Sequence, residues 1–266
     1  GAGTDTLKIA SGTSFVGLSI SSVEAIDAGG GWIEMLPQQL TALGITQANN
    51  ITLRLSTALT NGGTLDASVL TGKVSLQGTN QSDLLIGNAQ ANNIYLGSDP
   101  GVGAGFGVDT VQAGEGDDHI YLTTVRSVNR PVGQQIFSNF DLNSRTYYET
   151  GSIDGGTGFD TLTVDLSNPW WGHAWGGDAL YYSGTTTPIW HLDLSGWSWT
   201  HLEKFELLGY DASRPWQTPA EVVLRTTQIQ DLQSASGLYS VSIVGGGNLD
   251  LQHLADLGIN NWRVSD

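Results

Sequence analysis

Short runs in which apolar and polar residues alternate recur along this chain of 266 residues. The clearest is Ile51-Thr52-Leu53-Arg54-Leu55, and alternation with a period of two is typical of a strand with one buried face. Such runs predict strands at 5–9, 16–20, 23–27, 51–56, 73–77, 84–86, 93–96, 109–112, 118–123, 160–166, 189–194, 203–208, 221–225, 239–244 and 261–264. Short helical turns are predicted at 36–43, 227–234 and 251–257, the first and last of which are followed by glycine. The pattern therefore predicts an all-β protein with few, short helices.

Segment 105–120 is the most informative part of the chain and reads GFGVDTVQAGEGDDHI. It holds two copies of the pattern G-x-G-x-D-x-U-x, where U is a large apolar residue, with Asp109 and Asp118 as the carboxylates. Glycines permit the tight curvature of a loop whose carbonyls must face a cation, and the aspartate supplies a hard anionic oxygen. The apolar residue is then buried in the strand that follows. The spacing predicts two calcium-binding nonapeptides in tandem.

Further copies of the pattern lie elsewhere in the chain. Segment 155–162 matches every position, and 1–7 matches from its second glycine onward. Segments 78–85 and 87–94 keep the nine-residue step, from Asp83 to Asn92, but lose most of the glycines. We assign these two segments to stacked turns that support the stronger loops, with Asp83 still a candidate ligand.

These segments resemble the hemolysin-type calcium-binding (RTX) repeats of secreted bacterial proteins, as found in S-layer proteins and adhesins. The resemblance implies a parallel β-roll in which each nonapeptide gives a loop and a short strand, and calcium sits between loops stacked on the same side, about eighteen residues apart. The calcium-site residues it implies are Gly1, Gly3, Asp5, Asp83, Gly105, Gly107, Asp109, Gly114, Gly116, Asp118, Gly156, Gly158 and Asp160. The expected fold is thus all-β, a calcium-stabilised parallel β-roll or β-solenoid with short helical turns and irregular insertions.

The regular spacing is broken in two places. Asp109 follows Asn92 by seventeen residues instead of nine, which predicts an inserted bulge at 97–104. Asp109 is then expected to stack over Asp83, and Asp118 over Asn92. A long segment also separates Asp118 from the next good loop, and how that loop finds its neighbour stays open. Some loops, those of 78–94 above all, remain open to the alternative of tight turns without metal.

Composition agrees with a secreted or cell-surface calcium protein. Twenty-six acidic residues against ten basic ones give a formal net charge of −16, a self-repulsion that bound divalent cations would relieve and that disfavours nucleic acid as a partner. The chain has no cysteine, which excludes disulfides and zinc-cysteine sites. No apolar run approaches the roughly 20 residues of a membrane span. The chain begins with Gly and not Met, so we expect it to be a segment of a longer protein.

The order of short motifs after 5–7 recurs after 160–162, which predicts an internal duplication. On this basis the chain divides into a first β-solenoid unit at 1–77, a nonapeptide block at 78–121, an inserted excursion at 122–154 and a second unit at 155–266 that carries a Trp-rich insertion. The alternative is a coincidence between two ordinary β-rich segments. A duplicated platform favours a scaffold over a lone active site.

Six of the nine tryptophans lie between 170 and 199, close to histidines and tyrosines. Such a cluster could be a sugar-stacking platform, because aromatic faces cover the apolar face of a pyranose ring. It could equally be core filler or a contact between modules, the interpretation we prefer. The residues named as a candidate glycan site are Trp170, Trp171, Trp175, Trp197 and Trp199.

Catalytic motifs are absent from the sequence, which has no G-x-S-x-G turn, no H-E-x-x-H pair and no cysteine nucleophile. We therefore expect a structural, non-enzymatic segment of a secreted bacterial surface protein, of the S-layer or adhesin type, that binds Ca²⁺ to fold, rigidify and assemble. The expected partners are calcium and neighbouring copies or adjacent modules, with surface polysaccharide as a further candidate. The alternatives are a glycan-binding module of an adhesin, or a non-catalytic calcium module of a secreted polysaccharide-active enzyme or protease.

Overall fold

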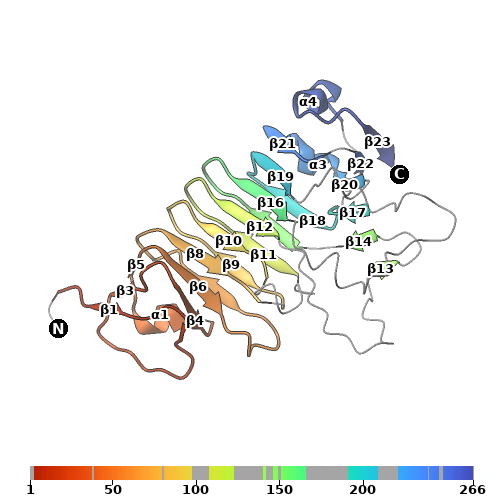
Figure 1. The fold of residues 1–266 in the computed structure, drawn as a ribbon. Helices are drawn as coiled ribbons and strands as arrows, with labels where there is room; N and C mark the ends of the chain where they lie inside the picture. Colours follow the sequence, from red (N-terminus) through yellow and green to blue (C-terminus); the bar gives the residue numbers. More distant parts are fainter. Residues whose placement is uncertain are drawn as a thin grey trace.

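The chain winds into an elongated stack of β-rungs with its two termini at opposite ends (Figure 1). The computed structural model describes residues 3–37, 39–79, 81–97, 108–122, 140–141, 146–148, 151–165, 191–208, 221–238, 240–245 and 248–265. Strand accounts for 42% of the structure and helix for 9%. These proportions, with parallel pairing throughout the nine-stranded and five-stranded sheets, confirm the expectation of a mostly β, parallel roll or solenoid.

Two parallel sheets form the two sides of the stack. The larger has nine strands in the order β2 (Thr13–Ser14), β4 (Trp32–Met35), β6 (Ile51–Leu55), β8 (Val74–Gln77), β10 (Asn93–Tyr95), β12 (His119–Leu122), β16 (Thr161–Asp165), β19 (Lys204–Leu208) and β21 (Ser234–Ser236). The smaller has five, in the order β18 (Trp197–Thr200), β15 (Gly151–Asp154), β11 (Asp109–Gln112), β9 (Leu84–Ile86) and β7 (Thr64–Asp66). From β7 to β12 the chain alternates between the two sheets, so each pair of successive strands makes one turn.

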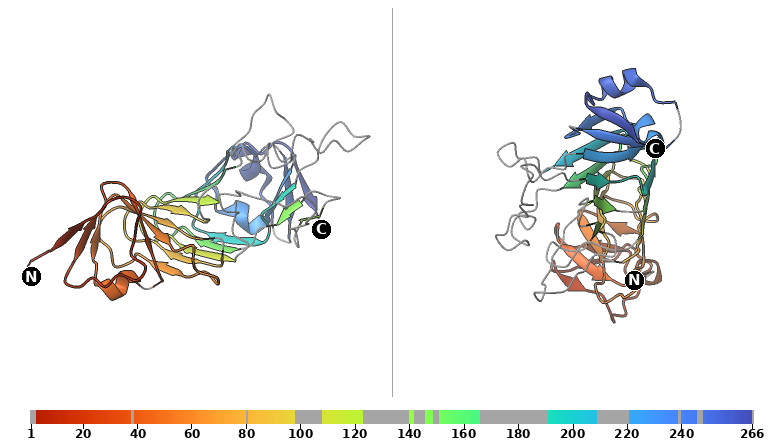
Figure 2. Two further views of the ribbon diagram at one scale, coloured as in Figure 1. Left: turned by 60° about the horizontal axis from the view of Figure 1, so that its bottom comes forward. Right: turned by 90° about the vertical axis from the view of Figure 1, so that its right-hand side faces the viewer.

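Two further sheets stand at the ends of the stack, as the two views of Figure 2 show. A three-stranded parallel sheet consists of β1 (Thr6–Lys8), β3 (Ala25–Asp27) and β5 (Gln47–Ala48). A six-stranded sheet consists of β13 (Phe140–Asp141), β14 (Thr146–Tyr148), β17 (His191–Asp193), β20 (Glu221–Arg225), β22 (Val241–Val244) and β23 (Trp262–Ser265), of which only the β13–β14 pair is antiparallel.

Alternation along each strand builds one continuous core between the sheets. In the nine-stranded sheet Leu53, Leu76, Ile94, Ile120 and Leu162 stack in register, one per rung, and each is at most 1% exposed. Burying an aliphatic side chain of this size contributes roughly 1.5–3 kcal/mol. Because every rung adds the same inward position, the period-two pattern that predicted the strands also places the core.

Among the described residues, three short helices lie between successive strands: α1 (Gln39–Leu43), α3 (Thr226–Gln230) and α4 (Leu251–Asp256). They overlap the three predicted helical turns, although α1 begins three residues later than predicted and α3 ends four residues earlier. In the part of the chain that the structure describes, no helix is long and apolar enough to cross a membrane.

One predicted strand, 16–20, is wrong. Gly17 has a φ of 78°, and the N–H of Leu18 donates to the carbonyl of Phe15 at 2.9 Å, so the chain turns here. The strands that the pattern missed, such as β7, β15 and β21, are two to four residues long, so each offers few positions from which an alternation can be recognised. Residues 98–107, which include most of the predicted bulge, and 123–139 of the predicted excursion lie outside the described residues.

Candidate metal centre

The acidic or amide residues of the predicted loops stack from rung to rung in two rows, which we call ladders. One ladder lies at the start of the strands of the five-stranded sheet (Asp83 and Asp109), and the other at the start of those of the nine-stranded sheet (Asn92, Asp118 and Asp160). The pairing of β9 with β11 sets Asp109 beside Asp83, and that of β10 with β12 sets Asp118 beside Asn92. Both stackings were predicted and are confirmed. The pairing of β12 with β16 then places Asp160 directly on Asp118. The nine-stranded sheet therefore passes directly from the Asp118 loop to the Asp160 loop, although a long insertion separates them in sequence.

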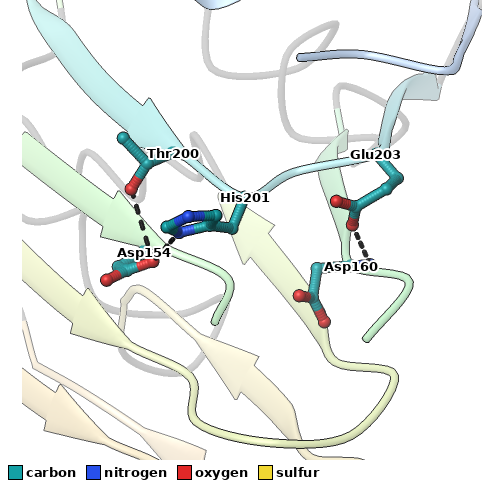
Figure 3. A network of polar contacts seen from close by, with 5 residues as sticks. All are labelled: Asp154, Asp160, Thr200, His201 and Glu203. Atoms are coloured by element: carbon teal, nitrogen blue, oxygen red, sulfur yellow. Dashed lines mark hydrogen bonds and ion pairs between the residues drawn. The ribbon is translucent and has the colours of Figure 1, made fainter. Parts of the chain in front are cut away.

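Each carboxylate in the longer ladder is tied to the backbone of the rung before it. Asp118 Oδ1 accepts a hydrogen bond from the N–H of Asn92 at 2.7 Å, and Asp160 Oδ1 accepts one from the N–H of Asp118 at 2.7 Å. Glu203 Oε2 repeats the contact by accepting from the N–H of Asp160 at 2.7 Å (Figure 3). One oxygen of each carboxylate thus fixes the register between rungs.

The second oxygen of two of these carboxylates has no partner. Asp118 and Asp160 are 1% and 0% exposed, and the Oδ2 atom of each is buried without a hydrogen bond to any residue that the structure describes. An unpaired buried carboxylate oxygen is costly, so the group must take up a proton or meet a cation. Burial raises the pKa of Asp118 to about 7 and that of Asp160 to about 6; the charge of Asp160 adds to the rise at Asp118, and that of Glu203 adds to the rise at Asp160.

Glycine allows the two loops that carry these aspartates to lie in backbone contact. Gly156 has a φ of 93°, and a Cβ at this position would lie 1.9 Å from the carbonyl oxygen of Gly114. A Cβ on Gly158 would lie 2.1 Å from the carbonyl oxygen of Gly116. The N–H of Thr157 donates to the Gly114 carbonyl at 3.0 Å, which holds the loops together. The glycines of the nonapeptide are therefore required by stacking as well as by curvature.

The donor set suits a hard cation. Among the residues that the structure describes, no three His, Asp or Glu side chains come together as a metal cluster. Backbone carbonyl oxygens, which are abundant in such loops, are also ligands of calcium. A cation at this stack would therefore be held by the carboxylates of Asp118 and Asp160 together with carbonyls of the 114–118 and 156–160 loops. The two orphaned oxygens and the glycine-only packing fit such an ion.

The second ladder is shorter. Asp109 Oδ1 accepts from the N–H of Asp83 at 2.9 Å, and burial raises the pKa of Asp109 to about 7 and also raises that of Asp83. Gly105 and Gly107, the predicted glycines of this loop, lie outside the described residues. The next strand in this sheet brings Gly151 beside Asp109, so the row of acidic side chains ends here.

The N-terminal loop stays apart from these ladders. Gly3 has the expected positive φ, at 119°, but nothing lies within 4 Å of the position of a Cβ there. Asp5 is exposed, and its N–H donates to Glu24 Oε2 at 2.9 Å. Gly1 lies outside the described residues. The structure thus places Gly3 and Asp5 on a terminal rung, away from the other predicted loops.

The candidate glycan residues divide between the core and parts that are not described. Trp197 and Trp199 are 2% and 5% exposed, and Trp199 Nε1 donates to the carbonyl of Gln228 at 2.8 Å. Their rings are packed in the core, which favours that interpretation and leaves no open face for a sugar. Trp170, Trp171 and Trp175 lie outside the described residues.

Residues at the far end of the ladder were not identified from the sequence as part of this site. Glu203 takes the ladder position of an aspartate although no nonapeptide precedes it. His201 has a φ of 53°, in the region that glycines occupy in the other loops, and its Nδ1 contacts Asp154 Oδ1 at 2.7 Å (Figure 3). This contact raises the pKa of His201. Only strand register reveals the equivalence, because the turn shares no residue pattern with the loops beneath it.

Comparison with known proteins gives no match: no family model, curated protein or solved structure is similar to this chain. The likeness to RTX repeats therefore depends on the loop residues themselves.

Proposed function

We propose that this chain is a calcium-stabilised structural segment whose main ion site is the stack of the 114–118 and 156–160 loops. One observation carries the proposal. Two fully buried carboxylates, Asp118 and Asp160, sit on adjacent glycine loops, and each keeps an oxygen without a partner. Calcium at this stack would supply the positive charge that these oxygens lack.

The chain's own residues prepare the site. Backbone N–H donors fix one oxygen of each carboxylate and leave the other free. Glycines let the loops approach to backbone contact. The bound ion would therefore clamp β12 to β16, two strands that a long insertion separates in sequence. This is a rigidifying role, since it joins rungs of a stack and involves no reacting group.

The compartment follows from the chemistry of the ion. Calcium sites of modest affinity fill where calcium is abundant, outside the cell, and extracellular modules bind it with dissociation constants of about 10⁻⁴–10⁻³ M. A chain of net charge −16 without cysteine suits such a setting, where ions could supply the stability that disulfides give elsewhere. We accordingly propose a secreted or cell-surface protein of the S-layer or adhesin type, with neighbouring copies or adjacent modules as its partners.

Calorimetric titration of the metal-stripped protein with calcium tests this proposal. We expect saturable binding that is lost or strongly weakened in Asp118→Asn and Asp160→Asn, because a neutral amide cannot replace the carboxylate charge. Asp27→Asn is the matched control, since Asp27 is an exposed aspartate on β3 that caps the N–H of Gly29 and lies outside the loops. Wild-type protein that binds no calcium would refute the proposal, as would equal effects of all three substitutions.

A further inference from the structure

Four loops of the roll can be compared at the position four residues before the ladder residue, where two carry glycine and two do not. Gly114 and Gly156 hold this position in the loops of Asp118 and Asp160. Thr79 and Asn88 hold it in the loops of Asp83 and Asn92. The two degenerate loops thus carry a polar side chain where the two matching loops carry none, and those side chains face the ladder residue.

In the first degenerate loop, Thr79 satisfies the carboxylate from within. Thr79 Oγ1 donates to Asp83 Oδ2 at 2.9 Å, and the N–H of Thr79 donates to the same oxygen. The other oxygen, Asp83 Oδ1, accepts from the N–H of Gly63 at 2.8 Å. Both oxygens of this buried carboxylate therefore have protein donors, unlike the carboxylates of Asp118 and Asp160, each of which keeps one unpaired oxygen.

In the second degenerate loop, the side-chain amides of Asn88 and Asn92 hydrogen-bond to each other and leave no carboxylate. Asn92 Nδ2 donates to Asn88 Oδ1 at 2.9 Å, and the N–H of Asn88 donates to Asn92 Oδ1 at 2.9 Å. Asn88 Nδ2 donates in turn to the carbonyls of Leu70 and Gly72, at 2.9 and 2.8 Å, on the rung before. The amide group of Asn88 thus links two carbonyl oxygens of the neighbouring rung to its own loop. A bound cation would link the two rungs in the same way, by coordinating carbonyl oxygens from both.

The glycine loops show the opposite state. Gly114 and Gly156 have φ values of 112° and 93°, whereas neither Thr79 nor Asn88 has a positive φ. With no side chain at this position, Asp118 and Asp160 keep their unpartnered Oδ2 atoms. Backbone conformation, side chain and carboxylate pairing therefore change together between the two kinds of loop.

We infer that Thr79 and Asn88 close the ion sites of their own loops, so that the roll has metal-free rungs at 78–92 and a metal-dependent joint at 114–160. This inference rests on the proposed calcium binding and sharpens it, because Asp83 is then a structural hydrogen-bond acceptor and not a calcium ligand. Loss of calcium would loosen the joint while the rungs before it stay hydrogen-bonded.

The number of calcium ions bound per chain, measured by calorimetry and by elemental analysis of the dialysed protein, tests the inference. Asp83→Asn should bind as many ions as the wild type, whereas Asp118→Asn should lose one. Thr79→Gly, which removes the closing hydroxyl and permits the positive φ of Gly114 and Gly156, should gain one ion. Thr79→Ser keeps that hydroxyl and should gain none. Far-UV circular dichroism confirms that each variant is folded.

The outcomes separate the two ideas. If the wild type binds calcium and Asp83→Asn loses an ion as Asp118→Asn does, the inference is wrong while the proposed function stands. A folded Thr79→Gly variant that gains no ion also contradicts it. If the wild type binds no calcium, the proposed function itself fails, and the inference fails with it. Should Thr79→Gly not fold, the comparison of Asp83→Asn with Asp118→Asn decides alone.

Discussion

The N–H of Asp118 donates a 2.7 Å hydrogen bond to Oδ1 of Asp160, a residue forty-two positions further along the chain. The contact is the same as that between Asn92 and Asp118 one rung earlier, where the separation is twenty-six residues. Rungs of very different length thus end in the same carboxylate-to-backbone contact. The contacts between successive ladder residues, more than the length of the chain between them, set the register of the stack.

Glycine at 156 is predicted to be indispensable for this stacking. Gly156→Ala would place a Cβ 1.9 Å from the Gly114 carbonyl at a φ of 93°. Gly44→Ala is the control, because Gly44 also has a positive φ, 70°, but nothing lies within 4 Å of its Cβ position. We expect the control to cost about 1–2 kcal/mol of unfolding free energy from backbone strain alone, and Gly156→Ala distinctly more. Urea denaturation measures both, and equal costs would mean that the loops are not in the contact described.

Stability without calcium is predicted to fall as the pH rises from about 4 to about 7. The folded-state pKa values of Asp109 and Asp118, about 7, and of Asp160, about 6, exceed the ordinary value of 3.8, so the folded protein binds these protons more tightly than the unfolded chain does. The stabilisation is complete below pH 4 and is lost as each group ionises. Saturating calcium should restore stability near pH 7, because the ion replaces the protons.

Melting temperatures between pH 4 and 8, in chelator and in calcium, check this prediction. The double variant Asp118→Asn/Asp160→Asn should show a shallower pH dependence in chelator, since two of the carboxylates with a raised pKa are gone. Wild-type curves that are flat over this range would contradict the assignment of buried, unpaired carboxylates.

The buried indole of Trp199 is predicted to serve packing alone. Trp199→Phe removes the 2.8 Å hydrogen bond to the Gln228 carbonyl and leaves that buried oxygen short of a donor, a loss of about 1–3 kcal/mol. Calcium binding should be unchanged, because the ring lies in the core and not at the loops. Denaturation and calcium titration of the same variant separate the two effects, and weakened calcium binding without loss of stability would be inconsistent with a packing role.

The sequence predicts the regular part of the roll well because there the nine-residue step is itself the structure. Asp109 over Asp83 and Asp118 over Asn92 follow from counting residues and looping out the excess. The pairing of Asp118 with Asp160 does not, since no spacing rule says where a chain returns after a long insertion. The position of Glu203 in the ladder was not predicted for another reason: the turn before it contains no glycine and so does not match the nonapeptide pattern.

Local signals also fail where tertiary packing decides. Strand 16–20 was predicted from its apolar residues, but the positive φ of Gly17 turns the chain there. The role of Thr79 and Asn88 is invisible in the sequence, where they read only as lost glycines. Their meaning appears once both are seen to hydrogen-bond Asp83 and Asn92, the side chains that a cation would otherwise hold.

The most direct test of a calcium-stabilised roll is the thermal melting curve of the wild-type protein at neutral pH, in saturating calcium and in excess chelator. A single site filled at ten times its dissociation constant contributes about 1.4 kcal/mol. For a chain of this size each kcal/mol shifts the melting temperature by about 2–4 °C. We predict a clearly lower melting temperature in chelator, reversed by added calcium. Identical curves in the two conditions would contradict the account.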